Sequence, residues 1–304
     1  MTEEFGHPSL RPVVFGVERT ICCHRAGLSG HHIPNSLAAI SECVSAGVPR
    51  LEIDVRFLAD GAIAVFHDRD LEHDTTGSGP IETWKRESLA EVRHKADHQT
   101  GIAFLEDVVE VMAGSATLLQ VDLKPLSLIP VGQLQELERV LRPMGDGVIV
   151  GSQGHWNLRR LAGVPIAFDP WLQFRHQPGR KSMGGPHTLG FHGMWDDSPV
   201  AVSPFFSAAE YVETRIDDLV PLLPRTVEWM VDIPTVLHIG ALGVRLGEAL
   251  ARRGISLAAW TLRESSGDPD GLMGQLFAVG TTTVITDMPL AAAAAATRLA
   301  SAAA

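Results

Sequence analysis

The sequence lacks several features that mark particular classes of protein. Its 25 Lys and Arg residues are outnumbered by 36 Asp and Glu residues, for a formal net charge of −11, and they form no basic stripe. Nucleic acid needs a basic surface, so we expect no nucleic-acid binding. No apolar run approaches the ~20 residues of a membrane span, and no basic segment followed by an apolar one opens the chain. We therefore expect a cytoplasmic protein without a signal peptide or a stable membrane anchor.

Cysteine is scarce as well. Cys22, Cys23 and Cys43 are an odd number, and the two adjacent residues are poorly placed to pair with each other. We expect reduced, buried thiols rather than a disulfide framework. The chain also lacks the Cys and His spacing of a zinc site and the glycine pattern of a phosphate-binding P-loop.

The composition is otherwise that of a globular protein, with 45% hydrophobic and 20% charged residues among 304. Short β-branched runs alternate with helical patterns, which favours parallel βαβ units. The expected strands are 20–24, 50–55, 63–66, 117–123, 147–151, 165–168, 227–233, 257–262 and 282–286. The expected helices are 35–46, 105–112, 133–141 and 239–253, with an Ala-rich terminal helix that frays over 290–304.

One of these runs does not belong to a parallel sheet. Only a short polar turn with Asp60 and Gly61 precedes the run 63–66, and a parallel crossover needs a dozen or more residues. That run must form a hairpin, which leaves eight strands. We predict an α/β protein with one (β/α)₈ TIM-barrel domain over 1–304 and an insertion over about 57–101. The irregular segment 171–203 is interpreted as a lid or substrate-selecting loop, with disorder as the alternative.

Carboxylates stand at the ends of two of the predicted barrel strands, where barrel active sites lie. Glu52 and Asp54 are two residues apart and so point to the same face, and Asp122 ends a later strand. Three such groups at one mouth would repel each other unless a hard divalent cation lay between them. This pattern predicts an Mg²⁺ or Ca²⁺ site.

Histidines and cations occur at the same strand ends. His24 and His67 would supply an acid and a base near neutral pH, and Arg25 and Lys124 would hold an anion. A metal, two acid–base groups and anion-binding cations together suit attack at a phosphoryl centre.

The motifs resemble the signature of the glycerophosphodiester phosphodiesterase family. The matching stretches are Cys23-His24-Arg25-Ala26-Gly27, Asn35-Ser36-Leu37-Ala38-Ala39, Leu51-Glu52-Ile53-Asp54-Val55, Val65-Phe66-His67-Asp68, Thr75-Thr76-Gly77, Asp122-Leu123-Lys124, Ala259-Trp260-Thr261 and Ile285-Thr286-Asp287-Met288-Pro289. The resemblance implies metal-dependent hydrolysis of a small-molecule, glycerophosphodiester-like phosphodiester to an alcohol and a phosphomonoester. It also implies acid–base roles for His24 and His67, metal ligation by Glu52, Asp54 and Asp122, and substrate contacts from Arg25, Lys124 and Trp260.

The sequence departs from that signature at three positions. Ala26 stands between the usual His-Arg and Gly, Pro34 replaces a usual Glu, and Asp122 replaces a frequent Glu. The shorter Asp122 is similar to the sphingomyelinase-D-like relatives, so a phospholipase-D-like lyase that forms a cyclic phosphate remains an alternative. A catalytically silent barrel that binds a phosphodiester is a third hypothesis.

Four further positions are not assigned to a single role. Gln153 follows a strand end and could line the pocket, whereas Asp287 could belong to the site or cap the last helix. His31 is either a substrate contact or a solvated loop residue, and the same holds for the adjacent His32.

Overall fold

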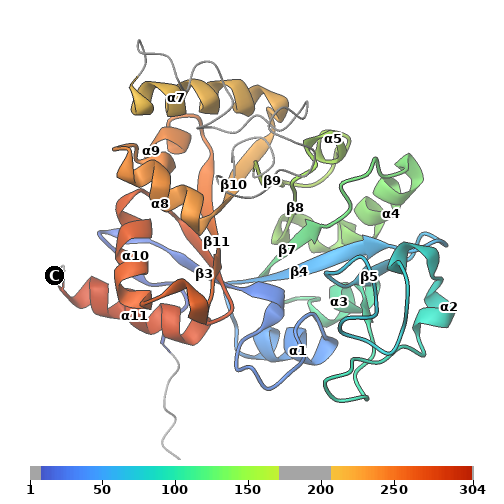
Figure 1. Cartoon of the computed structure of the whole chain (residues 1–304). Helices are drawn as coiled ribbons and strands as arrows, with labels where there is room; N and C mark the ends of the chain where they lie inside the picture. The colour runs from blue at the N-terminus through green and yellow to red at the C-terminus, as the bar shows by residue number, and fades with distance from the viewer. Residues whose placement is uncertain (1–7, 171–206, 303–304) are drawn as a thin grey trace, which may run out of the picture.

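A ring of eight parallel strands forms the centre of the molecule (Figure 1). The computed structural model describes residues 8–170 and 207–302. The last strand of the ring pairs with the first, which in turn pairs with the second, so the sheet closes. The predicted (β/α)₈ barrel is therefore confirmed. In chain order, its strands are β3 (Thr20–Cys23), β4 (Arg50–Phe57), β7 (Leu118–Leu123), β8 (Val148–Ser152), β9 (Ile166–Phe168), β10 (Thr226–Asp232), β11 (Ser256–Leu262) and β12 (Thr283–Thr286).

Two strands are bonded outside the ring. β5 (Ile63–Val65) runs antiparallel to β4, as the short turn predicts, and β6 (Ala103–Phe104) adds antiparallel to β5. The segment between them includes a 3₁₀ turn, η2 (Ile81–Thr83), and a short helix, α2 (Arg86–Leu89). This insertion has a small hydrophobic core of its own, which explains how so long a connection stays ordered. Its core residues are Leu58, Ala64, Phe66, Leu71, Ile81, Leu89, Val92, Ile102 and Phe104.

Helices surround the ring (Figure 1). The helical connections between successive barrel strands return the chain to the starting end of the next strand, as parallel pairing requires. The helices and 3₁₀ turns are η1 (His24–Ala26), α1 (Leu37–Ser45), α3 (Leu105–Val111), α4 (Val131–Leu141), η3 (Arg142–Gly147), α5 (His155–Leu158), α7 (Ala208–Leu219), η4 (Val220–Leu222), α8 (Ile233–Ala241), α9 (Leu246–Ala251), η5 (Glu264–Ser266), α10 (Pro269–Ala278) and α11 (Pro289–Ala302). A small hairpin of β1 (Val13–Val14) and β2 (Val17–Glu18) precedes the barrel.

One expectation about helices is wrong. The single helix expected over 239–253 is two helices, because Gly243 adopts a φ of +85° between the end of α8 and the start of α9. A left-handed glycine just after a helix ends it. The expected Ala-rich terminal helix is present as α11, which packs against α10 and buries Ala292, Ala293 and Ala296 completely. Among the described residues, no helix is long and apolar enough to cross a membrane.

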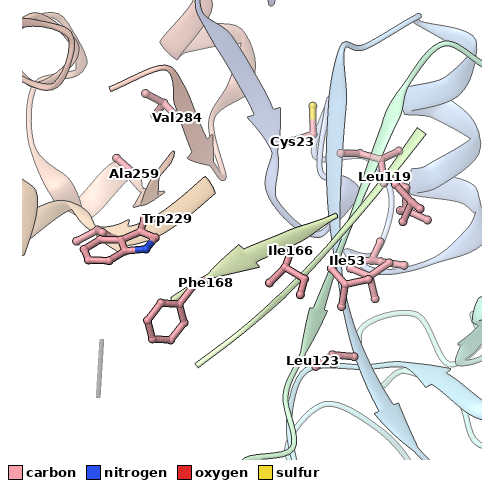
Figure 2. Packing of buried hydrophobic residues seen from close by; sticks show 14 of the residues in the cluster. Cys23, Ile53, Leu119, Leu123, Ile166, Phe168, Trp229, Ala259 and Val284 are labelled. Atoms are coloured by element: carbon pink, nitrogen blue, oxygen red, sulfur yellow. The ribbon is translucent and has the colours of Figure 1, made fainter. Parts of the chain in front are cut away.

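The strands bury side chains on both faces. One set of side chains, inside the ring, comprises Cys22, Ile149, Ala167, Met230, Ala258 and Ile285. The alternate residues face the helices and form the main core; they include Ile53, Leu119 and Ile166 (Figure 2). Phe168 and Trp229 meet edge to face in this layer, with ring centroids 6.1 Å apart (Figure 2). The polar strand ends are thus supported by packing on both sides.

Candidate active site

A cleft opens at the carboxyl ends of the barrel strands. Most of the residues predicted from the sequence line it: His24, Arg25, Glu52, His67, Asp122, Lys124 and Trp260. The remaining predicted residue, Asp54, is completely buried and contacts the cleft through Arg25 and Lys124. The other lining residues are Gln120, Gln153, Asp169, Met230, Thr261, Arg263 and Ile285.

His24 begins a tight turn directly after β3. Arg25 and Ala26 both adopt left-handed backbone conformations there, with φ of 51° and 56°. Hydrogen bonds hold this unfavourable geometry: the Gly27 N–H donates to the His24 carbonyl at 2.9 Å, and the Arg25 N–H donates to Glu52 Oε2 at 2.9 Å. Ala26, the residue that departs from the family signature, therefore lies inside the turn that presents His24. Left-handed residues that are held in place this way occur mainly at functional sites.

The three predicted metal ligands lie together. Oxygen atoms of Glu52, Asp54 and Asp122 are all within 4.8 Å of one another. The register of β4 and β7 explains this, since it places Asp54 directly beside Asp122. Asn35, which lies just before α1, donates a hydrogen bond from Nδ2 to Asp54 Oδ2 at 2.9 Å.

Two cations partly neutralise these carboxylates. Lys124 Nζ lies 2.8 Å from Asp54 Oδ1 and 2.7 Å from Asp122 Oδ2, and Arg25 Nε lies 3.0 Å from Asp54 Oδ2. The sequence predicts Arg25 and Lys124 as phosphate contacts. Both line the cleft, but each also forms an ion pair with a carboxylate.

The surroundings of Glu52 and Asp54 shift the pKa values of these two carboxyl groups in opposite directions. Burial, followed by repulsion from Asp54, raises the pKa of Glu52 to about 7. Burial also acts to raise the pKa of Asp54, but the charges of Lys124 and Arg25 outweigh it, so that this pKa lies well below its usual range. Glu52 is thus a carboxylate whose negative charge is not fully compensated. A divalent cation would compensate it, and carboxylate oxygens are ligands that Mg²⁺ and Ca²⁺ prefer.

Each histidine is held through the same ring nitrogen. His24 Nδ1 lies 2.5 Å from Asp287 Oδ1, and His67 Nδ1 lies 2.5 Å from Asp68 Oδ1. An ionised carboxylate only accepts hydrogen bonds, so Nδ1 carries the proton in the neutral rings and Nε2 keeps a free lone pair. Burial, together with the charges of Lys124 and Arg25, lowers the pKa of His67 although Asp54 acts against it. The His67 ring is therefore available as a neutral base.

Several residues of the cleft were not assigned to the site from sequence. Asp169 and Arg263 follow the ends of β9 and β11, so the strand-end rule could have found them. The same rule would have misassigned Asp232, which caps α8 by accepting from the Thr235 N–H at 3.0 Å. Of the positions left open, Gln153 does line the cleft.

The remaining open positions have different outcomes. Asp287 accepts a hydrogen bond from His24 in the cleft. The neighbouring Thr286 Oγ1 accepts a hydrogen bond from the Met288 N–H at 2.9 Å. His31 and His32 are exposed and do not line the cleft. The irregular segment 171–203, interpreted as a lid, lies outside the described residues.

Known proteins are similar to this chain in sequence and fold. The family model of the glycerophosphoryl diester phosphodiesterases matches residues 24–141. A glycerophosphodiester phosphodiesterase of Bacillus altitudinis is 30% identical over 146 residues, which cover 45% of this chain and 59% of that protein. One of Caldanaerobacter subterraneus is 23% identical over 154 residues, covering 46% and 61%. The chain thus spans less than two thirds of the length of these relatives.

Solved structures match the fold over most of its length. The glycerophosphodiester phosphodiesterase of Agrobacterium tumefaciens has a TM-score of 0.60 at 16% identity, covering 90% of this chain and 97% of that one. A phosphodiesterase of Oleispira antarctica, in complex with the product sn-glycerol-3-phosphate, has a TM-score of 0.58 at 18% identity, covering 90% and 95%. At these identities the likeness concerns the fold alone. The chain is therefore similar to the glycerophosphoryl diester phosphodiesterases in sequence over residues 24–141 and in fold over most of its length.

Proposed function

We propose that this chain is a divalent-cation-dependent phosphodiesterase. Its substrate is a glycerophosphodiester-like molecule, which it cleaves to an alcohol and a phosphomonoester. The observation that carries the proposal is one cleft lined by two carboxylate-held histidines, His24 and His67, beside the oxygens of Glu52, Asp54 and Asp122. The family match over residues 24–141 agrees with it.

The histidines act as the acid–base pair. One Nε2 removes the proton of a substrate hydroxyl next to the diester, and that oxygen attacks phosphorus. The other histidine protonates the departing alcohol, which leaves a cyclic phosphate on the retained group. Water then opens the ring while the two histidines exchange roles, and the phosphomonoester is released.

The carboxylates hold the cation. Glu52, Asp54 and Asp122 offer oxygen atoms within 4.8 Å of one another, and the raised pKa of Glu52 marks negative charge that a cation would compensate. When bound, Mg²⁺ or Ca²⁺ supplies positive charge for the non-bridging oxygens of the phosphoryl group. Arg25 and Lys124 add positive charge at the same place.

Trp260 forms a wall of the substrate pocket. It lines the cleft at the end of β11, and its buried indole Nε1–H has no hydrogen-bond partner in the described part of the chain. An acceptor oxygen on the substrate would satisfy this donor. The sn-glycerol-3-phosphate bound to the Oleispira antarctica protein agrees with a glycerol phosphate as the product here.

Phosphorus NMR tests the proposal directly. Purified protein is incubated with a mixture of glycerophosphodiesters in Mg²⁺ or Ca²⁺, and then with a chelator. We expect cation-dependent appearance of a phosphomonoester signal, which His24→Ala abolishes and His31→Ala leaves unchanged. His31 is a suitable control because it is exposed and outside the cleft.

Other outcomes point to the alternative functions. A cyclic phosphate that persists would replace the hydrolase by a lyase, for which the shorter Asp122 is the motivating residue. The absence of both turnover and cation binding would leave a silent phosphodiester-binding barrel, and the enzymatic proposal would be wrong.

A further inference from the structure

Asp287 lies beside His24 because the barrel closes. β12 ends at Thr286, which pairs with Cys23 at the end of β3, so the residues that follow the two strands are neighbours. The Asp287 N–H donates to the Leu262 carbonyl at 3.0 Å, which fixes the backbone at this point. The carboxylate therefore reaches His24 from a different strand, whereas His67 receives its carboxylate from the next residue in the chain.

Both oxygens of Asp287 are engaged. Oδ1 accepts from His24 Nδ1 at 2.5 Å, and Oδ2 lies 3.4 Å from Arg263 Nε. Arg263 also lines the cleft. The three side chains form a line in which Arg263 holds the carboxylate and the carboxylate holds the ring.

The contact determines which ring nitrogen of His24 is available. With the proton on Nδ1, the lone pair is on Nε2, and Nε2 lies 3.8 Å from Glu52 Oε2 at the carboxylate cluster. The His24 side chain is only 10% exposed, so few water molecules compete for the Nδ1 proton. Without a carboxylate acceptor, the neutral ring could place its proton on Nε2 and lose its function as a base.

We propose that Asp287 is the positioning residue of His24, fixing the Nδ1–H form of the ring and directing Nε2 into the cleft, with Arg263 orienting Asp287. This proposal rests on the proposed phosphodiesterase function for its catalytic consequence. The tautomer of His24 can be measured without any activity, so the two proposals can be tested separately.

The first measurement is the tautomer. In protein with ¹⁵N-labelled histidine, long-range ¹⁵N–¹H spectra at about pH 8 distinguish the two neutral forms of each ring. The His24 signals are identified as those that His24→Ala removes. We expect the Nδ1–H form in the parent protein and a shift toward the Nε2–H form in Asp287→Asn. An unchanged tautomer in Asp287→Asn would overturn the proposal, whether or not the protein cleaves a diester.

The second measurement is kinetic. We expect Asp287→Asn to lower kcat by about 10²-fold or more while KM changes by less than about threefold, because the base is mispositioned but the substrate still binds. Asp287→Glu keeps the carboxylate and should recover part of the loss. A kcat for Asp287→Asn equal to that of the parent would also overturn the proposal.

A surface variant controls for general effects of removing a carboxylate. Asp270→Asn breaks an exposed ion pair with Arg298, 2.7 Å long and away from the cleft. We expect it to alter neither the His24 tautomer nor kcat. If parent and variants all fail to cleave diesters, the proposed function is wrong, and the spectra still decide the role of Asp287.

Discussion

At the scale of single residues, two chemically similar side chains in the candidate site have different pKa values. Glu52 and Asp54 are two residues apart on one strand, yet burial raises the pKa of Glu52 while Lys124 and Arg25 lower that of Asp54. The sequence identifies both as candidate ligands, because their spacing puts them on one face. The sequence does not reveal that their pKa values differ, because this difference depends on Lys124 and Arg25, which the fold places beside Asp54.

Cation binding should depend on pH through Glu52. Its pKa of about 7 without metal means that the group is partly protonated near neutral pH, and only the carboxylate binds a cation. Affinity should therefore weaken as the pH falls below about 7, by up to about tenfold per unit. Calorimetry near pH 7 in two buffers of different ionisation enthalpy should detect release of part of a proton. Glu52→Gln should bind weakly and release none; equal release by this variant would refute the assignment to Glu52.

The turn that positions His24 should tolerate glycine in place of Ala26. A left-handed conformation costs a non-glycine residue about 1–2 kcal/mol, so Ala26→Gly should relieve strain at its φ of 56°. Loss of the buried methyl group and the greater freedom of the unfolded chain offset part of this gain. We expect the free energy of unfolding to change by less than about 1 kcal/mol.

The matched control is Ala293→Gly. Ala293 is equally buried but lies within α11, where glycine has no conformational advantage, and the expected loss is about 1–2 kcal/mol. Urea denaturation of both variants measures the difference. Equal destabilisation would mean that the turn is not strained.

At the scale of elements, close packing of backbones limits what the helices tolerate. α9 begins next to the turn before β12, where the Gly247 N–H donates to the Val279 carbonyl at 2.8 Å. A Cβ on Gly247 would overlap the backbone of Gly280, whose own φ of +90° suits only glycine well. Sequence periodicity over 239–253 cannot report such an approach, since it arises from a segment about thirty residues further along the chain.

Gly247→Ala should accordingly destabilise the protein. The clash involves backbone rather than a flexible side chain, so we expect a loss of roughly 2–4 kcal/mol in the free energy of unfolding. Gly132→Ala is the matched control, because Gly132 lies in the first turn of α4 and a Cβ there meets nothing within 4 Å. That variant should be neutral or slightly stabilising in urea denaturation. A neutral Gly247→Ala would show that α9 can move away.

At the scale of the whole molecule, a buried ion pair spans the inside of the barrel. Arg50 on β4 donates to Glu228 on β10, at 2.9 Å from Nη1 to Oε2, and to Gln120 on β7. Three strands separate β4 from β10 on either side of the ring, so the pair joins opposite walls. Burial acts to lower the pKa of Arg50, but the charge of Glu228 outweighs it and raises that pKa.

Removing one member of this pair should cost more than removing both. Glu228→Gln leaves the buried Arg50 charge uncompensated, for an expected loss of about 3–5 kcal/mol in the free energy of unfolding. The double variant with Arg50→Met should lose markedly less. Asp270→Asn, which breaks the exposed pair with Arg298, should lose less than about 1 kcal/mol. Urea denaturation of the parent, Glu228→Gln, Arg50→Met and the double variant gives the coupling free energy, and additive losses would contradict a direct interaction.

The order of the barrel strands, the hairpin after the second barrel strand and the polar side chains at the strand ends could all be predicted from the sequence alone. These follow from local periodicity and loop length, which each segment carries on its own. Which side chains meet could not be predicted in this way: Asp287 contacts His24 across 263 positions, and Arg50 contacts Glu228 across 178. Such pairs form only when the eight strands close into a ring. Closure and the register between neighbouring strands depend on packing of the whole sheet against its helices, which no single segment of the sequence encodes.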